Sequence, residues 1–550
     1  MKPTEQQKII IDYNGNSVVV AAPGSGKTFV ISQKIKRNLH NLKEHEGVIA
    51  ISYTNKASTE LKNRCLSNGE NPKSSFFGTI DKFNLSEVLI PFGKLLFGIP
   101  STDIKIIKKD SLENFENESL DWIDRNLLLT DLDKEKLNIL VNYFLNGIIL
   151  IETIGLFSNY VLDQSIACQN YIKAKYKFMY IDEYQDSGQH QHDIFLKIKN
   201  LGANAIAVGD LNQSIYAFSG KDAKFLKELS ENDTFEQFIL DKNHRCHPSI
   251  INYSNYLLND KAVMIPNVES RVYHFETEGD ESSIANFLDK NLIRLKKYFD
   301  IKHNNQIALL VRGKSTAKIL VNSLKTPNRY FISNDLDSNL NIWSLIFSNL
   351  LHYVFNISHK FIDIIEVFTS YDKLLKREIE ELKKVKKNID YIIASGNIDI
   401  TKLKEQFIDI ANIIAPKLSN DESINLLDSV LNNKEELDSY RSAGSEELVI
   451  MTLHKSKGLE FDLIIHLDLY EWVLPAKRPG KNNDFDNPIY PNYTQDLNLH
   501  YVGITRAIKG CILFTSTRRT NAIGETRSGR HSEFLTLEGI QKLRYIDPKT

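Results

Sequence analysis

The sequence predicts an α/β protein with doubly wound parallel sheets, on three observations. An apolar run from Val18 to Ala22 passes through Pro-Gly-Ser-Gly into a stretch with apolar residues at helical spacing, which is the order strand, loop, helix. Two later apolar segments, FMYI and AIAVG, are each followed by acidic residues, at the strand end where a parallel sheet places its chemistry. At 550 residues the chain is too long for one core, so we expect about three or four domains.

Composition and charge are those of a globular protein without a general affinity for nucleic acid. Hydrophobic residues make up 42% and charged residues 25%, and the formal net charge is −2, so any nucleic-acid path must be a local groove. The four cysteines form no CxxC pair, which argues against a disulfide framework or zinc knuckle and favours a reducing compartment. Asn146 and Glu152 break the longest apolar stretch, and no signal-peptide pattern begins the sequence, so we expect a cytoplasmic protein without a membrane anchor.

The stretch PGSGKT after the first predicted strand indicates a phosphate-binding loop of the Walker A type. Glycines allow the backbone N–H groups of Gly24, Ser25 and Gly26 to turn inward around an anion, and the next helix adds the positive end of its dipole. Lys27 then reaches the β- and γ-phosphates, and the Thr28 hydroxyl ligates Mg²⁺. The alternative is an accidental glycine-rich turn, which the flanking strand and helix disfavour.

The acidic residues that such a loop requires follow the later predicted strands. Asp182 and Glu183 come directly after a buried strand; we expect Asp182 to hold Mg²⁺ and Glu183 to orient and polarise the attacking water. Gln213 follows the next strand, in a position to sense the γ-phosphate. Tyr216 and Phe218 come just after it, and taken alone they are more typical of a hydrophobic core than of a binding surface.

A series of sequence blocks runs along the whole chain in a fixed order: TEQQ, PGSGKT, SYTNKASTEL, GTIDKF, IDEYQDS, VGDLNQSIYAFSG, DKNHRCHPSI, MTLHKSKGLEF and YVGITRA. In these blocks the sequence resembles the UvrD/Rep-type superfamily 1 DNA helicases. The resemblance implies two RecA-like doubly wound parallel-sheet motor domains, each carrying a mainly helical insertion. It also implies an enzyme that hydrolyses ATP or dATP with Mg²⁺ and moves 3′ to 5′ along single-stranded DNA.

The blocks also imply how the chain is divided. We expect the first motor domain at residues 1–88 and 169–236 with an insertion at 89–168, and the second at 237–334 and 446–550 with a reduced insertion at 335–445. Within the second insertion, the charges from Asp372 to Lys387 alternate in sign at helical spacing. That pattern is typical of a solvated helix face, and the wall of a DNA channel remains an alternative.

The resemblance assigns further nucleotide contacts. Arg245 and Arg506 would reach the γ-phosphate from the second motor domain, which requires that the two domains close. Phe29 and His244 stand where relatives sandwich the base, so we expect any purine to stack there, although Phe29 also fits the core face of its helix. The remaining implied contacts are Gln6, which would hydrogen-bond to adenine, Gly458 and Glu460.

The implied DNA contacts lie on both motor domains. The base-stacking positions fall on Tyr53, Tyr216 and Phe218, and because all three are aromatic, the resemblance favours a binding platform over a core. The implied phosphate contacts are Thr54, Asn55, Lys56, Thr452 and His454. Two departures weaken this assignment: Asp81 stands where a histidine commonly touches DNA, and Ser219 where an arginine is common.

A narrower resemblance is carried by GTIDKFNLSEVLIPFGKLLFG, by the spelling IDEYQDS and by the reduced second insertion. In these features the sequence is similar to the helicase-like GajB subunits of Gabija anti-phage defence systems. That resemblance implies a hetero-oligomer with GajA, an ATPase-TOPRIM nuclease of the OLD type. Two alternatives remain: an NTPase that senses DNA ends or single strands, unwinds little and activates a partner nuclease, and a general DNA-repair helicase.

Overall fold

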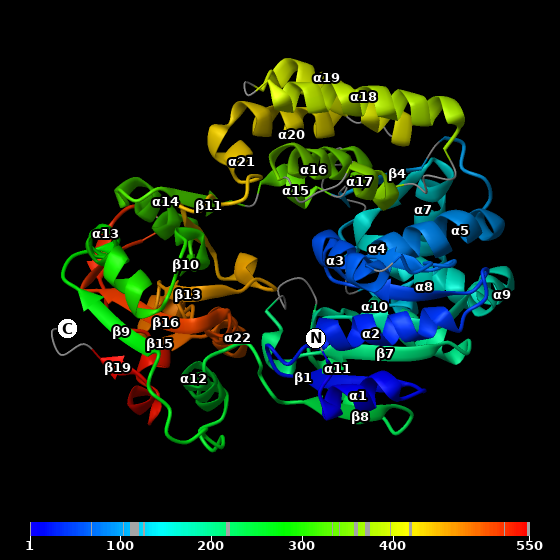
Figure 1. The fold of residues 1–550 in the computed structure, drawn as a ribbon. Helices are drawn as coiled ribbons and strands as arrows, with labels where there is room; N and C mark the ends of the chain where they lie inside the picture. Colours follow the sequence, from blue (N-terminus) through cyan, green and yellow to red (C-terminus); the bar gives the residue numbers. More distant parts are fainter. Residues whose placement is uncertain are drawn as a thin grey trace.

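The computed structural model describes residues 2–67, 69–102, 104–109, 120–124, 127–215, 221–332, 334–339, 341–356, 361–368, 374–395, 398–416, 421–521 and 523–546. Of residues 55, 56, 363, 366 and 367 it describes the backbone alone. Two sheet-containing bodies lie side by side, and a helical unit lies above both of them in the view of Figure 1.

The first sheet domain is built on six parallel strands in the order β3-β2-β6-β7-β1-β8. Its strands are β1 Ser17–Ala21, β2 Gly47–Ile51, β3 Phe76–Gly78, β6 Tyr176–Ile181, β7 Asn204–Gly209 and β8 Glu236–Leu240. Its helices are α1 Glu5–Asp12, α2 Lys27–His40, α3 Asn55–Leu66, α10 Gln189–Asn200 and α11 Lys224–Ser230.

Helices cover both faces of this sheet. Val18 and Ile49 belong to the hydrophobic core that includes Phe195 of α10, whereas Val19 and Val48 belong to the core that includes α2. Successive strand residues therefore point to opposite, equally apolar faces, which explains the continuous apolar runs of the sequence. The predicted α/β, doubly wound fold is confirmed.

A mainly helical insertion interrupts the first sheet between β3 and β6. It begins with α4 Ile80–Phe83, which passes through a π-helical stretch at Asn84–Leu89 into the rest of the insertion. The remaining elements are α5 Ile90–Phe97, β4 Lys105–Ile107, α7 Lys134–Leu145, β5 Ile148–Leu150, α8 Ile154–Gln164 and α9 Ile166–Lys175.

The second sheet domain has seven parallel strands in the order β11-β12-β10-β13-β16-β9-β19. Its strands are β9 Val272–Thr277, β10 Ile307–Val311, β11 Asn328–Phe331, β12 Leu448–Thr452, β13 Phe461–His466, β16 Ala507–Ser516 and β19 Tyr545–Ile546. Its helices are α12 Pro248–Leu258, α13 Glu281–Tyr298, α14 Lys314–Ser323 and α22 Tyr493–Thr505. Two hairpins project from it: β14 Arg478–Gly480 with β15 Asp484–Ile489, and β17 Arg518–Thr520 with β18 Thr526–Ser528.

The helical unit at the top of Figure 1 has a hydrophobic core of its own, centred on Trp343, Phe347 and Phe407. Its helices are α15 Asp335–Ser338, α16 Ile342–Phe355, α17 Phe361–Phe368, α18 Lys376–Ala394, α19 Ile400–Ile414, α20 Asp421–Asn432 and α21 Lys434–Asp438. The alternating-charge stretch falls largely on α18, which buries Leu382, Val385, Ile389 and Ile392. The Lys82 ammonium of α4 lies 5.1 Å from the ring centre of Phe368 in α17, so the unit contacts the first sheet domain.

One predicted domain boundary differs from the sheet pairing. The boundary after residue 236 falls at the first residue of β8, and β8 pairs in parallel with β1, so this strand belongs to the first sheet. β8 lies at the sheet edge and buries only its last residue, Leu240, and an edge strand of this kind leaves little apolar pattern in the sequence.

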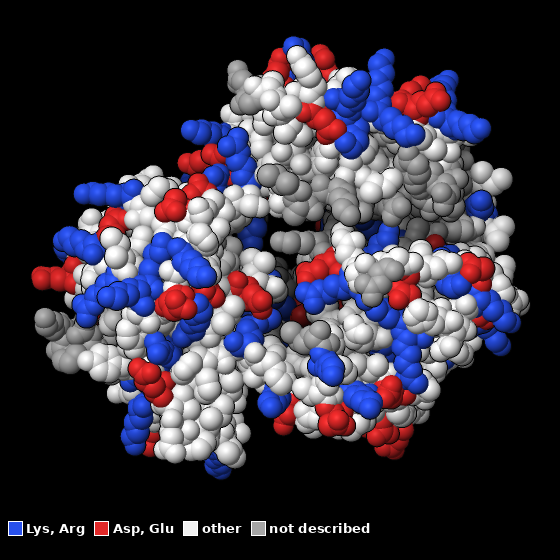
Figure 2. Space-filling view, in the orientation of Figure 1, with Lys and Arg blue, Asp and Glu red and all other residues white. Residues whose placement is uncertain are grey.

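The face shown in Figure 2 carries positive and negative side chains interspersed, with an opening between the two sheet domains and the helical unit. Among the described residues, no helix is both long and apolar enough to cross a membrane.

Candidate nucleotide and nucleic-acid site

The glycine-rich loop after β1 has the backbone that its sequence predicts. Gly24 and Gly26 have φ angles of 67° and 88°, the left-handed region that glycine adopts at little cost. A Cβ at Gly24 would lie 2.5 Å from Asn243 Oδ1, and one at Gly26 would lie 2.7 Å from Gln7 Nε2. The Ser25 hydroxyl donates to the carbonyl of Ala22 at 2.7 Å. Both glycines are therefore required by conformation, and Gly24 also by space, since its Cβ would lie 2.7 Å from Arg245 Cβ. Gly26 caps α2 directly before Lys27.

The Lys27 ammonium is buried beside this loop. Its nearest carboxylate oxygen, Asp210 Oδ2, is 3.8 Å away. Nζ makes no hydrogen bond within the part of the chain that the structure describes. A buried ammonium without an acceptor is costly, and a triphosphate held by the loop would supply the acceptors, so the residues present fit that ligand.

Asp182 and Glu183 stand at the end of β6, next to the loop. Thr28 Oγ1 donates to Asp182 Oδ2 at 3.4 Å, which brings together the two predicted Mg²⁺ ligands. Burial, then the neighbouring Glu183, raises the pKa of Asp182 to about 7, although Lys27 opposes the shift. An oxygen pair of this kind suits a hard divalent cation, which would return the Asp182 carboxyl to its ionised form.

Glu183 has a φ of 56°, which is unusual for a residue with a side chain and is typical of functional turns. Burial alone would raise its pKa, but the cations of Lys27 and Lys457 and a hydrogen bond from Gln185 lower the pKa to about 2. Glu183 is therefore ionised at neutral pH, as a residue that orients and polarises water must be.

The second sheet domain contributes to the same site. Arg506, at the end of α22, is buried, and its Nη2 donates to Gln213 Oε1 at 3.2 Å. Gln213 in turn donates to Asp210 Oδ2 at 2.8 Å. Burial lowers the pKa of Arg506 to about 10, so it stays charged at neutral pH. The predicted γ-phosphate sensor and one predicted arginine finger are thus brought together from the two domains.

Lys457 makes a second bridge between the domains. Its ammonium donates to Asp186 Oδ2 at 2.5 Å and to the Gln213 carbonyl at 2.7 Å, and it lies 3.8 Å from Glu183 Oε2. Burial raises the pKa of Asp186 to about 6, although Lys457 acts to lower it. Sequence reasoning missed Lys457: it lies inside the quoted block MTLHKSKGLEF, but no spacing rule marks a contact with a residue 271 positions away.

Of the other predicted residues of the second domain, Arg245 and His244 lie near the loop, each with a different partner. Arg245 Nε pairs with Glu460 Oε2 at 2.5 Å. The second predicted arginine finger is therefore paired with another residue that is predicted to contact the nucleotide. The His244 amide donates to the Gly24 carbonyl at 2.9 Å, which places exposed His244 against the loop. Gly458 has a φ of 82° and open space where a Cβ would project.

The two neighbouring glutamines of α1 lie differently. Gln7 is buried and its Nε2 donates to the Ser25 carbonyl at 2.9 Å, whereas Gln6 is exposed and its Nε2 donates to Asp241 Oδ1 at 3.3 Å. Gln7, which sequence reasoning did not select, is the glutamine in contact with the loop. Phe29 is half-buried against the core that includes α2, so the structure agrees with its core assignment and leaves base stacking a prediction.

A cleft on the first sheet domain adjoins the acidic residues. Its lining includes Tyr53, Asp81, Asp182, Glu183 and Lys221. The Lys221 ammonium lies 3.7 Å from the centre of the Tyr53 ring, a cation–π contact. Tyr53, which is predicted to stack on a base, therefore shares a cleft with the predicted hydrolytic residues. Asp81, which stands where the family commonly has a histidine, lines the same cleft.

Other predicted DNA contacts have structural roles or lie outside the described residues. Thr54 caps α3 by accepting from the Ala57 amide at 3.1 Å, and Thr452 Oγ1 accepts from the Lys455 amide at 3.4 Å. Tyr216, Phe218 and Ser219 lie outside the described residues. Of Asn55 and Lys56 the structure describes the backbone but not the side chains.

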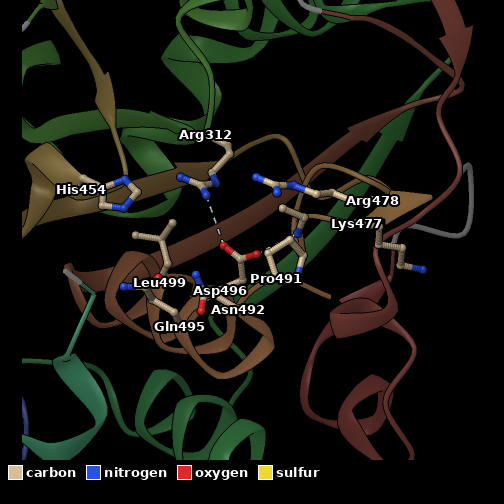
Figure 3. Close-up of a pocket in the computed structure, with 10 residues that line it drawn as sticks. Arg312, His454, Lys477, Arg478, Pro491, Asn492, Gln495, Asp496 and Leu499 are labelled. Carbon is tan, nitrogen blue, oxygen red and sulfur yellow. Dashed lines mark hydrogen bonds and ion pairs between the residues drawn. The ribbon is translucent and has the colours of Figure 1, made fainter. Parts of the chain in front are cut away.

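A pocket of about 500 Å³ opens in the second sheet domain beside His454. In Figure 3 the guanidinium groups of Arg312 and Arg478 both lie above Asp496, and that of Arg478 extends toward Arg312. Arg312 Nη2 pairs with Asp496 Oδ1 at 3.3 Å, and Asp496 also accepts from the Ala476 amide at 2.7 Å. Burial, together with Arg312 and Lys457, lowers the pKa of His454 to about 4, so its ring is neutral at physiological pH.

These features define a class of protein: a P-loop nucleotide-binding protein in which two parallel-sheet domains share one site. The model of the UvrD/REP helicase N-terminal domain matches residues 2–143 and 105–234, and that of the UvrD-like helicase C-terminal domain matches residues 348–518. The chain belongs to the UvrD/Rep family of ATP-dependent DNA helicases.

Relatives match over nearly the whole chain. Gabija protein GajB of Bacillus cereus is 28% identical, over 94% of this chain and 96% of its own length. The ATP-dependent DNA helicase Rep of Buchnera aphidicola is 24% identical, over 96% of this chain and 95% of its own. The ATP-dependent DNA helicase PcrA of Staphylococcus aureus is 23% identical, over 97% and 85%.

Proposed function

We propose that the protein is a DNA-dependent motor that hydrolyses ATP or dATP with Mg²⁺ and moves 3′ to 5′ along single-stranded DNA. We further propose that it is the helicase-like subunit of a Gabija-type defence complex, with an ATPase-TOPRIM nuclease of the OLD type as its partner. Family membership and the GajB relative support the two parts respectively.

One observation carries the motor assignment: Arg506 of the second sheet domain donates to Gln213 of the first, beside Lys27 and the β6 carboxylates. A site assembled from two domains changes whenever the domains move, and the reverse also holds. Nucleotide turnover in such a site is therefore coupled to domain motion.

The side chains divide the hydrolytic work by charge and position. Lys27 and Arg506 supply positive charge where negative charge spreads over the transferring phosphoryl group. Glu183, ionised and held by Gln185, orients the attacking water and withdraws its proton. Mg²⁺ held by Thr28 and Asp182 would neutralise phosphate charge.

The DNA strand would lie across both sheet domains. Tyr53 offers a ring for base stacking in the first cleft, and Arg312 and Arg478 both line the pocket of the second domain. Two guanidinium groups beside one carboxylate leave a net positive charge in the pocket, which suits binding of a phosphodiester group. Because stacking and backbone contacts tolerate any sequence, this grip fits a translocating motor.

A second candidate function is a DNA sensor that turns over nucleotide, unwinds little and activates a partner nuclease. The observation that favours it is Asp81, whose carboxylate belongs to the same cleft as Tyr53 and works against a DNA phosphate there. A weaker grip would still permit DNA-triggered hydrolysis but would limit strand separation.

The test combines two assays on the purified full chain: ATP hydrolysis with and without a single-stranded oligonucleotide, and displacement of a labelled strand from a duplex with a 3′ tail. Stimulated hydrolysis with displacement supports the motor. Stimulated hydrolysis without displacement supports the sensor, and hydrolysis indifferent to DNA contradicts both. Co-purification from the native host with a TOPRIM nuclease, or without one, decides between the defence complex and a general repair helicase.

A further inference from the structure

The helix α1 braces the phosphate loop through one side chain. Gln7 Nε2 donates to the Ser25 carbonyl at 2.9 Å, and Gln7 Oε1 accepts from the Thr4 amide at 3.0 Å. The side chain also fills the space beside Gly26, where a Cβ would come within 2.7 Å of Nε2. The amide of Gln7 thus links the start of α1 to the loop that is to hold the phosphates.

The other end of α1 is held by two cations of α2. The last carbonyl groups of a helix have no partner within it and carry partial negative charge. Lys34 Nζ donates to the Ile10 carbonyl at 2.8 Å and also to the Tyr13 carbonyl. Arg37 Nη1 donates to the Ile11 carbonyl at 2.8 Å. These two side chains together cap the C-terminus of α1.

Lys34 occupies a position where a charge is costly. Only 3% of the residue is exposed, and burial lowers its pKa to about 8, with Arg37 lowering it further and Asp12 opposing. An apolar residue would fill this space without that cost. Compared with an apolar residue at this position, the Lys34 ammonium adds its hydrogen bonds to the C-terminal end of α1.

We propose that Lys34, assisted by Arg37, is a positioning residue for nucleotide binding: it fixes α1 so that Gln7 braces Ser25 and Gly26. With eight residues, α1 is too short to be stable alone, so its placement depends on such contacts. The inference rests on the proposed nucleotide site and concerns how well that site is formed, not the chemical step.

The test measures, by calorimetry, the Kd of the protein for the Mg²⁺ complex of a non-hydrolysable ATP analogue. KM and kcat for ATP are measured in parallel in the presence of single-stranded DNA. Lys34→Met should raise Kd and KM about ten-fold, as expected for loss of a charged hydrogen bond, while kcat at saturating ATP stays within about two-fold. Lys34→Arg, which keeps a cation able to donate to α1, should restore most of the affinity. Lys36→Met is the matched control, since Lys36 is on the same helix and its ammonium donates to the exposed Ser67 Oγ at 3.0 Å instead of to α1.

A double-mutant cycle identifies the route. Gln7→Ala should weaken binding on its own, and Lys34→Met should then add little, because the residue through which it acts is already gone. Additive effects, or a wild-type Kd in Lys34→Met, would overturn the proposal while leaving the motor function standing. Failure of the wild-type chain to bind the analogue would overturn both. If Lys34→Met does not fold, Arg37→Met, at a more exposed side chain, decides the same question through the same cycle.

Discussion

Lys27 of the first domain and Lys457 of the second both act on the carboxyl groups that follow β6, so the electrostatic environment of those carboxyl groups depends on the position of the second domain. Lys27 lies at the loop, and Lys457 donates to Asp186 and lies close to Glu183. The carboxyl groups respond differently: the pKa of Asp182 is raised and that of Glu183 is lowered. Neighbouring carboxyls with separated pKa values fit separate roles, one for a metal ion and one for water.

Substitutions of two first-domain residues test the hydrolytic site. Lys27→Ala should abolish measurable turnover, because the phosphates lose their buried ammonium. Glu183→Gln should keep nucleotide affinity but lower kcat by at least about 100-fold, since the amide cannot accept the proton of water. Steady-state kinetics with a parallel binding measurement checks both; turnover near wild type in either variant would show that the site is misassigned.

Tyr53 is the one predicted stacking residue that the structure describes. Tyr53→Ala should weaken binding of an oligo-dT strand by about 1–3 kcal/mol, the usual value of a base–aromatic stack, and spare hydrolysis without DNA. Tyr391→Ala, on an exposed ring of α18, serves as the control. Unchanged affinity in fluorescence anisotropy titrations would return Tyr53 to a packing role.

At the scale of elements, the sequence predicted most of what parallel strands determine. The loop after β1, the carboxylates after β6 and Gln213 after β7 all stand at strand ends of one sheet, where they were expected. Such positions are readable because buried parallel strands form continuous apolar runs that end where the chemistry begins.

The remaining features depend on helix rotation or on long-range contacts. Gln6 and Gln7 are adjacent, so a rotation of about 100° per residue decides which one faces the loop. The signal that separates them is the capping-box spacing of Thr4 and Gln7, which the search for apolar periodicity does not detect. Lys457 and Lys34 act on partners in other elements, and their sequences give no sign of it. Pairing between β8 and β1 likewise joins an exposed edge segment to the sheet.

The pocket between β12, β14 and α22 predicts distinct roles for an arginine and a histidine. Arg312→Ala should reduce the salt dependence of single-strand binding by about one ion, as expected for one lost phosphate contact.

His454, whose pKa is lowered to about 4, is neutral from pH 6 to 8, so it contributes no charge there. Its protonation should strengthen binding only as the pH falls below about 5.

Binding isotherms at several salt concentrations and pH values check this prediction, with His454→Asn as the variant that keeps a donor but cannot ionise. The wild type and His454→Asn should show the same pH dependence between pH 6 and 8. A rise in wild-type affinity over that range that disappears in His454→Asn would contradict a neutral histidine.

At the scale of the whole molecule, the two sheet domains share one site. The helical unit of residues 335–438 contacts the first domain. Arg506 donates to Gln213, Lys457 donates to Asp186, and the Asn498 amide donates to the Ser214 carbonyl at 3.1 Å, so each of these side chains of the second domain contacts the first. Arg506 is the one predicted to touch the reacting phosphate. The central claim is therefore that the second domain completes the hydrolytic site of the first.

The most direct test is ATP hydrolysis by Arg506→Ala, measured with and without single-stranded DNA and compared with the wild type. Arg530→Ala, on a highly exposed arginine of the same domain, is the control. The account predicts that Arg506→Ala loses about 100-fold or more in kcat and most of the stimulation by DNA while nucleotide affinity changes little, because the contact strengthens in the transition state. Wild-type kcat and stimulation in Arg506→Ala would contradict the shared site.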